Sequence, residues 1–302
     1  MKVSMLLVML FAALIVPPFT DAAPRTKRAV PARHTVRFDP VVREKLVIAH
    51  IKQRLGSYGN AIVTDPRFAI DPAMFVRPLN QKPAVPRQRP RRYNYDYVFS
   101  LWSKEQGRRF LENNVIAFNY EEREFGVPRE VIDGVLNIET QWGQSMGKRP
   151  VVTTLYTLAV MRPDLVQPGW SEKQLIAFLS IFEDSDTDLF SIKGSSTGAF
   201  GLPQFEPTSY PVLAVNCHSD DDDDPPDLFD NGDAICSIGK YLAHAGWGLS
   251  EASHRQALFA YNHDTFYVGA ILDYADWLAG KSSEHPRYQL FHPKKTEGAA
   301  RK

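Results

Sequence analysis

Glu139 is the acidic residue whose place in the sequence most suggests chemistry. Ile132, Val135 and Leu136 precede it by seven, four and three residues, so in a helix that begins near Pro128 its carboxyl group shares a face with this apolar stripe. Burying an acid is costly unless it is paired or its pKa rises until it stays protonated. A raised pKa is what a general acid needs near neutral pH. The pattern therefore predicts either a catalytic acid or a structural ion-pair partner.

The acidic stretch from Ser219 to Asp230 has the length of a twelve-residue calcium loop. Its third, fifth, ninth and twelfth positions are acidic, as such a loop requires, and hold Asp221, Asp223, Asp227 and Asp230. The serine in position one, the aspartate where glycine is expected and the two prolines that follow depart from that pattern. The sequence leaves open a calcium site or a solvent-exposed loop.

Cys217 and Cys236 bracket this stretch and are the only two cysteines of the chain. In an oxidising compartment such a pair favours a disulfide, and the alternative is two buried free thiols. Closing a loop of this size would stabilise the fold by roughly 3 kcal/mol in the chain-entropy model.

The elements that must hold these residues are predicted to be helices, because apolar residues recur every three or four positions and two-residue alternation is rare. The sequence indicates a mainly α protein. We expect a short helix over 47–55, one or two over 97–124, one from Pro128, one capped by Ser171, one opening at Asp233 and stopping at Gly246, and two more over 250–262 and 265–278.

The chain divides by composition into four parts. Residues 1–22 read as an export signal that is removed, 23–92 as a basic arm with a short helix and a Pro/Arg-rich connector, 93–280 as the helical domain and 281–302 as a flexible tail. The apolar run near the start is shorter than the about 20 residues of a membrane span. With no cysteine beside the expected cleavage point, we expect a periplasmic or secreted protein without a lipid anchor. The formal net charge of +0 argues against a nucleic-acid partner, and we expect a monomer.

Four ordered segments resemble the lytic murein transglycosylase B family over about residues 93–277. They are Gly126–Ile132 with Ile138–Gly143, the glycine-rich stretch Ile192–Tyr210, Asp233–Trp247, and Tyr261–His263 with Tyr267. The resemblance implies a lysozyme-like helical domain with an elongated substrate groove. It departs from the larger members between Trp247 and Tyr261, where the chain lacks room for their small β-containing insertion.

By this resemblance Glu139 is the general acid and base, and Ser195 helps to orient it and the substrate's acetamido group. Gln204 lines the saccharide subsites, Tyr261 and Asn262 stand beside the catalytic carboxylate, and Tyr267 belongs to the same wall. Taken singly, these side chains also have simpler explanations: the serine could cap a turn, the glutamine could bond loop backbone, and the tyrosines could be half-buried packing residues. As a set they suit the implied ligand, because aromatic faces cover sugar rings and polar groups bind their substituents. Glycines at 194, 198 and 201 allow the close backbone approach that a sugar chain in a groove needs. The implied reaction cleaves the β-1,4 bond between N-acetylmuramic acid and N-acetylglucosamine in peptidoglycan glycan strands and closes a 1,6-anhydro ring. It requires no cofactor, and the family's calcium site falls on the acidic stretch.

Two alternatives remain at this point. In a hydrolytic muramidase, water would replace the C6 hydroxyl group as nucleophile. A catalytically inactive wall-binding protein would keep the groove without turnover. The single convincing acid favours the transglycosylase, because an ordinary glycosidase pairs two carboxyl groups and substrate assistance removes that need.

Overall fold

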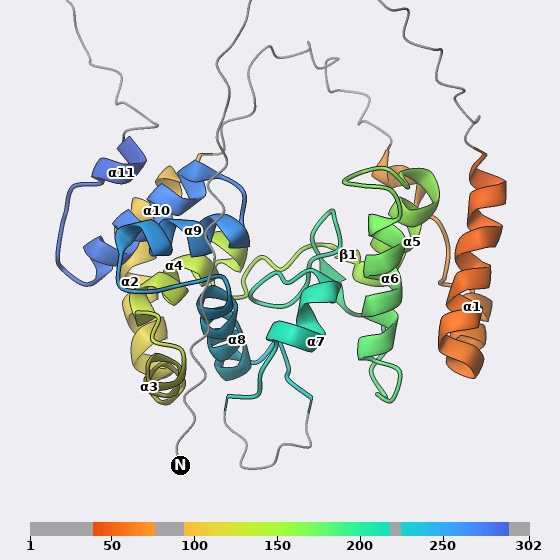
Figure 1. Cartoon of the computed structure of the whole chain (residues 1–302), viewed down its shortest axis with the longest axis horizontal. Helices are drawn as coiled ribbons and strands as arrows, with labels where there is room; N and C mark the ends of the chain where they lie inside the picture. The colour runs from red at the N-terminus through yellow and green to blue at the C-terminus, as the bar shows by residue number, and fades with distance from the viewer. Residues whose placement is uncertain (1–38, 76–93, 218–224, 290–302) are drawn as a thin grey trace, which may run out of the picture. The chain divides into compact units, whose positions relative to one another are not determined.

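The computed structural model describes residues 39–75, 94–217 and 225–289, and the predicted export signal lies outside them. Helices dominate these residues, which confirms the predicted mainly α class (Figure 1). The helices are α1 Pro40–Thr64, α2 Leu101–Asn113, α3 Val115–Glu124, α4 Arg129–Thr140, α5 Val151–Met161, α6 Trp170–Ile181, α7 Tyr210–Leu213, α8 Asn231–His244, α9 Glu251–Tyr261, α10 Thr265–Leu278 and α11 Pro286–Gln289. The strands β1 Arg149–Pro150 and β2 Lys193–Gly194 pair antiparallel, and 3₁₀ turns occupy Pro72–Met74, Asp96–Phe99 and Pro207–Ser209.

The apolar side chains form two clusters. The first, which we call core A, unites α2, α3, α4, α8, α9 and α10 and contains the stripe of α4. The second, core B, unites α1, α5 and α6 with part of the glycine-rich segment. Figure 1 shows the two groups of helices on either side of β1 and α7. Each core buries many fully covered aliphatic and aromatic side chains, and such burial is the main favourable term in folding.

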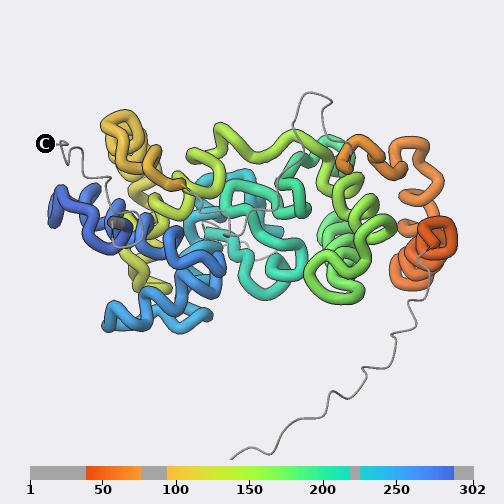
Figure 2. Tube along the Cα trace, turned by 90° about the horizontal axis from the view of Figure 1, so that it is seen from above, coloured from red at the N-terminus to blue at the C-terminus, as the bar shows by residue number. Residues whose placement is uncertain are grey.

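The glycine-rich segment 192–210 joins the two cores. Figure 2 shows it, in blue-green, between the two groups of helices. Its β2 strand pairs with β1 just before α5, and Phe200 pairs with Phe205 in an isolated bridge. The ring of Tyr261 at the end of α9 packs against both cores. The segment with candidate residues Ser195 and Gln204 is therefore held between α4 and α5.

Helix α1 and the later helices belong to one compact unit, and this unit spans Asp39–Lys302. Val47, Ile51 and Leu55 are buried on its face toward core B, as the predicted short helix implied, and the helix continues past a kink at Gly56. Arg43 donates to the carbonyl oxygen of Ala159 at 3.1 Å. The contacts therefore show no division at residue 93, where the sequence suggested a boundary.

Three local expectations were wrong. Ser171 does not cap α6, because the helix begins at Trp170 behind Gly169, whose φ is 79°. Asp233 does not open α8, because the cap of that helix is Asp230. Oδ1 of Asp230 accepts a hydrogen bond of 2.7 Å from the backbone nitrogen of Gly232. The predicted tail from residue 281 includes α11, whose Tyr288 is only 3% exposed.

The remaining part of that tail, residues 290–302, lies outside the described residues. Within the described ranges, no helix is both long and apolar enough to cross a membrane.

Candidate active site

Helix α4 carries Glu139 one residue before its end. Val131, Ile132, Val135 and Leu136 are buried in core A, so the helix is fixed by its apolar stripe and Glu139 is half-buried at the edge of that core. Burial raises the pKa of Glu139 to about 7. A carboxyl group with this pKa exchanges its proton near neutral pH, as a group serving as both acid and base must.

Tyr267 of α10 is the direct partner of this acid. Its side chain is fully buried, and its hydroxyl group donates a hydrogen bond of 2.8 Å to Oε1 of Glu139. This bond favours the ionised carboxylate and so limits the rise in the pKa of Glu139 that burial causes. Two of the sequence-predicted site residues are therefore in contact.

Tyr261 stands beside that pair and links it to the glycine-rich segment. Its ring lies nearly parallel to that of Tyr267, with centroids 6.4 Å apart and planes 11° apart. Its hydroxyl group donates to the carbonyl oxygen of Pro203 at 2.6 Å, so the residue before Gln204 is tied to this wall. Asn262 ends α9, and its own carbonyl oxygen accepts from the backbone nitrogen of Asp264 at 2.7 Å.

Ser195 and Gln204 make their described hydrogen bonds within their own segment. The Ser195 hydroxyl oxygen accepts from the backbone nitrogens of Thr197 and Ala199 at 3.2 and 3.0 Å. Gln204 has a left-handed backbone, with φ at 52°, and its amide donates to the carbonyl oxygen of Gly201 at 2.8 Å. Among the described residues no hydrogen bond joins either side chain to Glu139, so their predicted roles toward substrate stay predictions.

Two glycines of this segment are needed because other residues of the protein lie close to them. Gly198 and Gly201 have φ of 89° and 74°, and a Cβ atom would lie 2.3 Å from the Leu155 side chain at the first and 2.6 Å from Leu228 Cβ at the second. The next residue, Leu202, donates its backbone N–H to the carbonyl oxygen of Leu228 at 2.8 Å. The predicted close approaches exist, but here they are made to the protein's own residues.

Sequence reasoning missed two tyrosines near Glu139. The Tyr97 hydroxyl group donates to the carbonyl oxygen of Ile138 at 3.3 Å, and burial, followed by the charge of Glu139, raises the pKa of Tyr97 to about 12. The ring of Tyr95 meets that of Tyr267 edge to face, with centroids 6.0 Å apart. The run of tyrosines at 93, 95 and 97 was a signal, because aromatic residues are typical of saccharide sites.

A cavity of about 750 Å³ lies next to the end of α4. Gly143 and Gln144 of the turn after α4, Phe182 after α6, Lys193 of β2 and Asp227 are among its lining residues. Glu139 is not among them, so the cavity reaches the turn after α4 and does not include the acid. Its wall of aromatic, hydroxyl, amide and charged groups is suited to a polar ligand with apolar faces.

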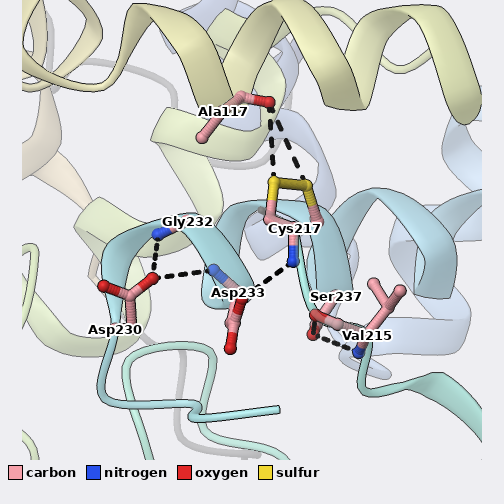
Figure 3. The surroundings of a disulfide bond; sticks show 8 residues. Ala117, Val215, Cys217, Asp230, Gly232, Asp233 and Ser237 are labelled. Carbon is pink, nitrogen blue, oxygen red and sulfur yellow. Dashed lines mark hydrogen bonds between the residues drawn. A yellow bond between two sulfur atoms is a disulfide. The ribbon is translucent and has the colours of Figure 1, made fainter. Parts of the chain in front are cut away.

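Hydrogen bonds anchor the acidic stretch at both described ends, and Figure 3 shows the first anchor, at Cys217. Cys217 and Cys236 form a disulfide in the structure, which joins the first anchor to α8. Asp233 accepts from the backbone nitrogen of Cys217 at 2.8 Å and from that of Asp227 at 2.7 Å. One carboxylate thus fixes the chain on either side of the stretch.

Two of the four predicted calcium ligands, Asp221 and Asp223, lie outside the described residues. Of the other two, Asp227 Oδ1 accepts from the backbone nitrogen of Phe229 at 2.9 Å, and Asp230 caps α8. The described residues hold no group of three or more His, Cys, Asp or Glu side chains placed to bind a metal. These residues do not make a cation site by themselves.

The family model described as "Transglycosylase SLT domain" matches residues 69–270, which is more than half of the chain. The chain belongs to this family. The match begins before residue 93 and covers every candidate residue of the site, so the resemblance carried by the four motifs is confirmed. The matched domain includes both the glycine-rich segment and helix α4, which carries the acid.

One similar curated protein is the membrane-bound lytic murein transglycosylase B of Escherichia coli K12. It is 35% identical over 144 residues, which make up 45% of this chain and 38% of that protein, so the alignment spans well under half of the relative. Two solved structures support the lysozyme-like fold. SltB3 from Pseudomonas aeruginosa in complex with NAG-anhNAM-pentapeptide is 20% identical with a TM-score of 0.62, covering 80% of each chain. The Escherichia coli lytic transglycosylase SLT35 in complex with calcium is 21% identical with a TM-score of 0.59, covering 79% of this chain and 93% of that one.

Proposed function

We propose that this chain is a peptidoglycan lytic transglycosylase. It cleaves the β-1,4 bond between N-acetylmuramic acid and N-acetylglucosamine in glycan strands and leaves 1,6-anhydro-N-acetylmuramic acid. The observation that carries the proposal is Glu139, an acid half-buried at the end of α4, with a pKa raised to about 7 and a hydrogen bond from Tyr267. Membership of the transglycosylase family and the relative that acts as a murein transglycosylase support it.

In this reaction Glu139 carries the proton in both halves. As an acid it protonates the glycosidic oxygen, and the bond from that oxygen to the anomeric carbon of the muramic sugar breaks. The substrate's acetamide carbonyl stabilises the anomeric centre. The Glu139 carboxylate then removes the proton of the C6 hydroxyl group, whose oxygen bonds to the anomeric carbon. The acid is regenerated, no water is consumed, and a second carboxyl group is not required.

The other candidate residues serve the saccharide. Tyr261 stands beside the acid with its ring stacked on that of the buried Tyr267, and Asn262 follows directly after α9. Ser195 orients the acid and the acetamido group in this proposal, and Gln204 contacts the sugar chain. The chain works on glycan strands in the periplasm or outside the cell as a monomer, after removal of residues 1–22. It needs no cofactor.

Calcium at the acidic stretch remains part of the proposal only through the pattern of Asp221, Asp223, Asp227 and Asp230. One solved relative of the fold contains calcium, whereas the described residues of this chain do not form a site alone. No step of the reaction passes through a metal ion.

The products of digestion test the proposal. Purified sacculi are incubated with the chain, and the soluble muropeptides are identified by mass spectrometry. We expect anhydromuropeptides. Reducing muropeptides would instead identify a hydrolytic muramidase, in which water opens the bond, and the absence of soluble products would leave the wall-binding alternative. Either of these outcomes overturns the proposed reaction.

Replacing Tyr267 by phenylalanine tests the coupling between the tyrosine and the acid. The lost hydrogen bond favoured the carboxylate, so the pKa of Glu139 rises above its parent value of about 7. Because the protonated form is the donor, the alkaline limb of the pH–activity profile should move to higher pH by about one unit, as expected for a bond to a charged group.

Tyr261→Phe is the matched control, since that hydroxyl group binds Pro203 and not Glu139. Its alkaline limb should stay close to that of the parent. Equal shifts in both variants, or no shift with Tyr267→Phe, would contradict the assigned contact.

A further inference from the structure

The turn that follows the acid is held in an unusual backbone conformation. Gln141 and Trp142 come directly after the last residue of α4 and have φ of 50° and 52°. Residues with a Cβ atom disfavour this left-handed region, so two in succession persist only when their surroundings hold them. Glu139 lies two residues before this turn, and any relaxation of the turn would therefore move the acid.

A buried carboxylate on the same helix holds the turn. The indole nitrogen of Trp142 donates to Oδ1 of Asp133 at 2.8 Å, so the side chain folds back along α4. Asp133 is completely buried and lies six residues before Glu139. The indole ring also packs against Trp102 and Phe110 of α2, with centroids 6.2 and 6.4 Å away.

The second oxygen of Asp133 bonds to α10, the helix that carries the partner of the acid. Tyr274 donates to Oδ2 of Asp133 at 2.9 Å, while Tyr267 donates to Glu139 at 2.8 Å. The two tyrosines are seven residues apart on α10, and the two acids are six apart on α4. Two parallel bonds therefore set the register of one helix against the other. No cation pairs with Asp133 among the described ion pairs. Burial raises the pKa of Asp133 to about 7, and the hydrogen bonds from Trp142 and Tyr274 limit that rise because they favour the carboxylate.

The end of α4 is also attached to the glycine-rich segment. The Thr140 hydroxyl group donates to the carbonyl oxygen of Leu202 at 3.0 Å and accepts from the backbone nitrogen of Gly143 at 3.1 Å. The residue after the acid is thus fixed to one side of the site, and the turn beyond it is fixed by Asp133. The acid itself has little freedom to move relative to Tyr267.

We propose that Asp133 is a positioning residue for Glu139: by binding Trp142 and Tyr274 together, it holds the left-handed turn and the α4–α10 register that place the acid against Tyr267. Asp133 does not touch substrate in this proposal. The inference rests on the proposed function only for its effect on turnover. Its effect on the titration of Glu139 follows from the geometry alone.

Four variants separate positioning from stability. Trp142→Phe keeps a ring but loses the donor, and Asp133→Leu loses both bonds. Asp133→Asn keeps an oxygen that can accept from the indole. Tyr156→Phe removes a part-buried bond in core B, the 2.8 Å hydrogen bond to Glu44, without touching Asp133, Trp142 or Tyr274.

We expect Trp142→Phe and Asp133→Leu to lower kcat about tenfold or more, with KM within about threefold, because a small misplacement of a catalytic group is costly. Asp133→Asn should restore most of kcat. Tyr156→Phe should lower Tm and leave kcat near that of the parent. The pKa of Glu139, followed by carbon NMR of labelled glutamate with Glu139→Gln for assignment, should fall in the first two variants because the displaced acid is better hydrated.

The proposal is overturned if the folded Trp142→Phe and Asp133→Leu proteins keep the parent kcat and the parent titration of Glu139. It is also overturned if kcat in all four variants falls only in step with Tm. A parent that releases no anhydromuropeptides would refute the proposed function instead, and the titration would still decide whether Asp133 positions the acid.

Discussion

Replacing Glu139 by glutamine should reduce the release of anhydromuropeptides by about a thousandfold, within the range by which a positioned acid or base accelerates a reaction. Glutamine keeps the shape of the side chain and can still accept a hydrogen bond from Tyr267. It cannot give a proton to the glycosidic oxygen or take one from the C6 hydroxyl group. Both halves of the reaction therefore stop, and the loss appears in kcat. The measurement is the rate of product release from sacculi.

The same substitution has an expected effect on stability. The pKa of Glu139 is raised from 4.5 to about 7 on folding, so the folded protein binds this proton more tightly than the unfolded chain. The contribution of Glu139 to stability is complete below about pH 4.5 and declines as pH rises toward 7. The glutamine variant should therefore gain stability relative to the parent above neutral pH, as urea unfolding at pH 8 would measure.

Glu130→Gln is the control, since Glu130 lies in the first turn of the same helix, at the end away from Tyr267. Its activity and its stability at pH 8 should stay close to those of the parent. Equal rates for the Glu139→Gln variant and the parent would remove the acid from the mechanism.

Replacing both Cys217 and Cys236 by serine should lower the free energy of unfolding by about 3 kcal/mol. The two residues are 19 apart in the sequence, and the bond restricts the unfolded chain more than the folded one. The folded form keeps other anchors, because Asp233 still binds the backbone on both sides of the acidic stretch. Urea denaturation of oxidised protein gives the value.

Reduced parent protein is the control for this pair. It should unfold at a urea concentration no lower than that of the double-serine variant, since both lack the cross-link and the variant also buries two hydroxyl groups in core A. Product release by the double variant should stay near the parent rate at temperatures where it is folded. Unchanged stability after reduction would show that the bond does not cross-link the protein in solution.

The sequence was most informative where apolar spacing and motif agreed. The stripe before Glu139 predicted both α4 and the half-buried acid, and α10 runs over the expected residues 265–278. Long, strongly periodic segments give such agreement, because one face must be buried whatever the remaining fold is.

Helix boundaries, the short helices α7 and α11, and the long helix α5 were less predictable. Ser171 and Asp233 are residue types that favour N-caps, but a glycine and the earlier Asp230 take those positions. Helix α5 was not predicted, because it is covered on nearly every side and rich in β-branched residues, so it shows no single apolar stripe. Burial on all sides is set by tertiary contacts, which local spacing does not contain.

The site itself could be predicted only in part. Tyr267 was expected in the wall, but its bond to Glu139 depends on the packing of α10 on α4. Tyr95 and Tyr97 were missed because they approach the acid from a 3₁₀ turn that has no periodic signal. The hydrogen bonds of Ser195 within its own turn likewise follow from local geometry that composition does not reveal.

The double attachment of Asp233 to Cys217 and Asp227 has an engineering consequence. Both ends of the intervening stretch are fastened to the first turn of α8, so an inserted peptide there would enter and leave at adjacent, immobilised points. Epitope tags or fluorescent reporters placed between these attachments should be accepted with little loss of the native state. This position is therefore a suitable internal handle for following the protein in living cells.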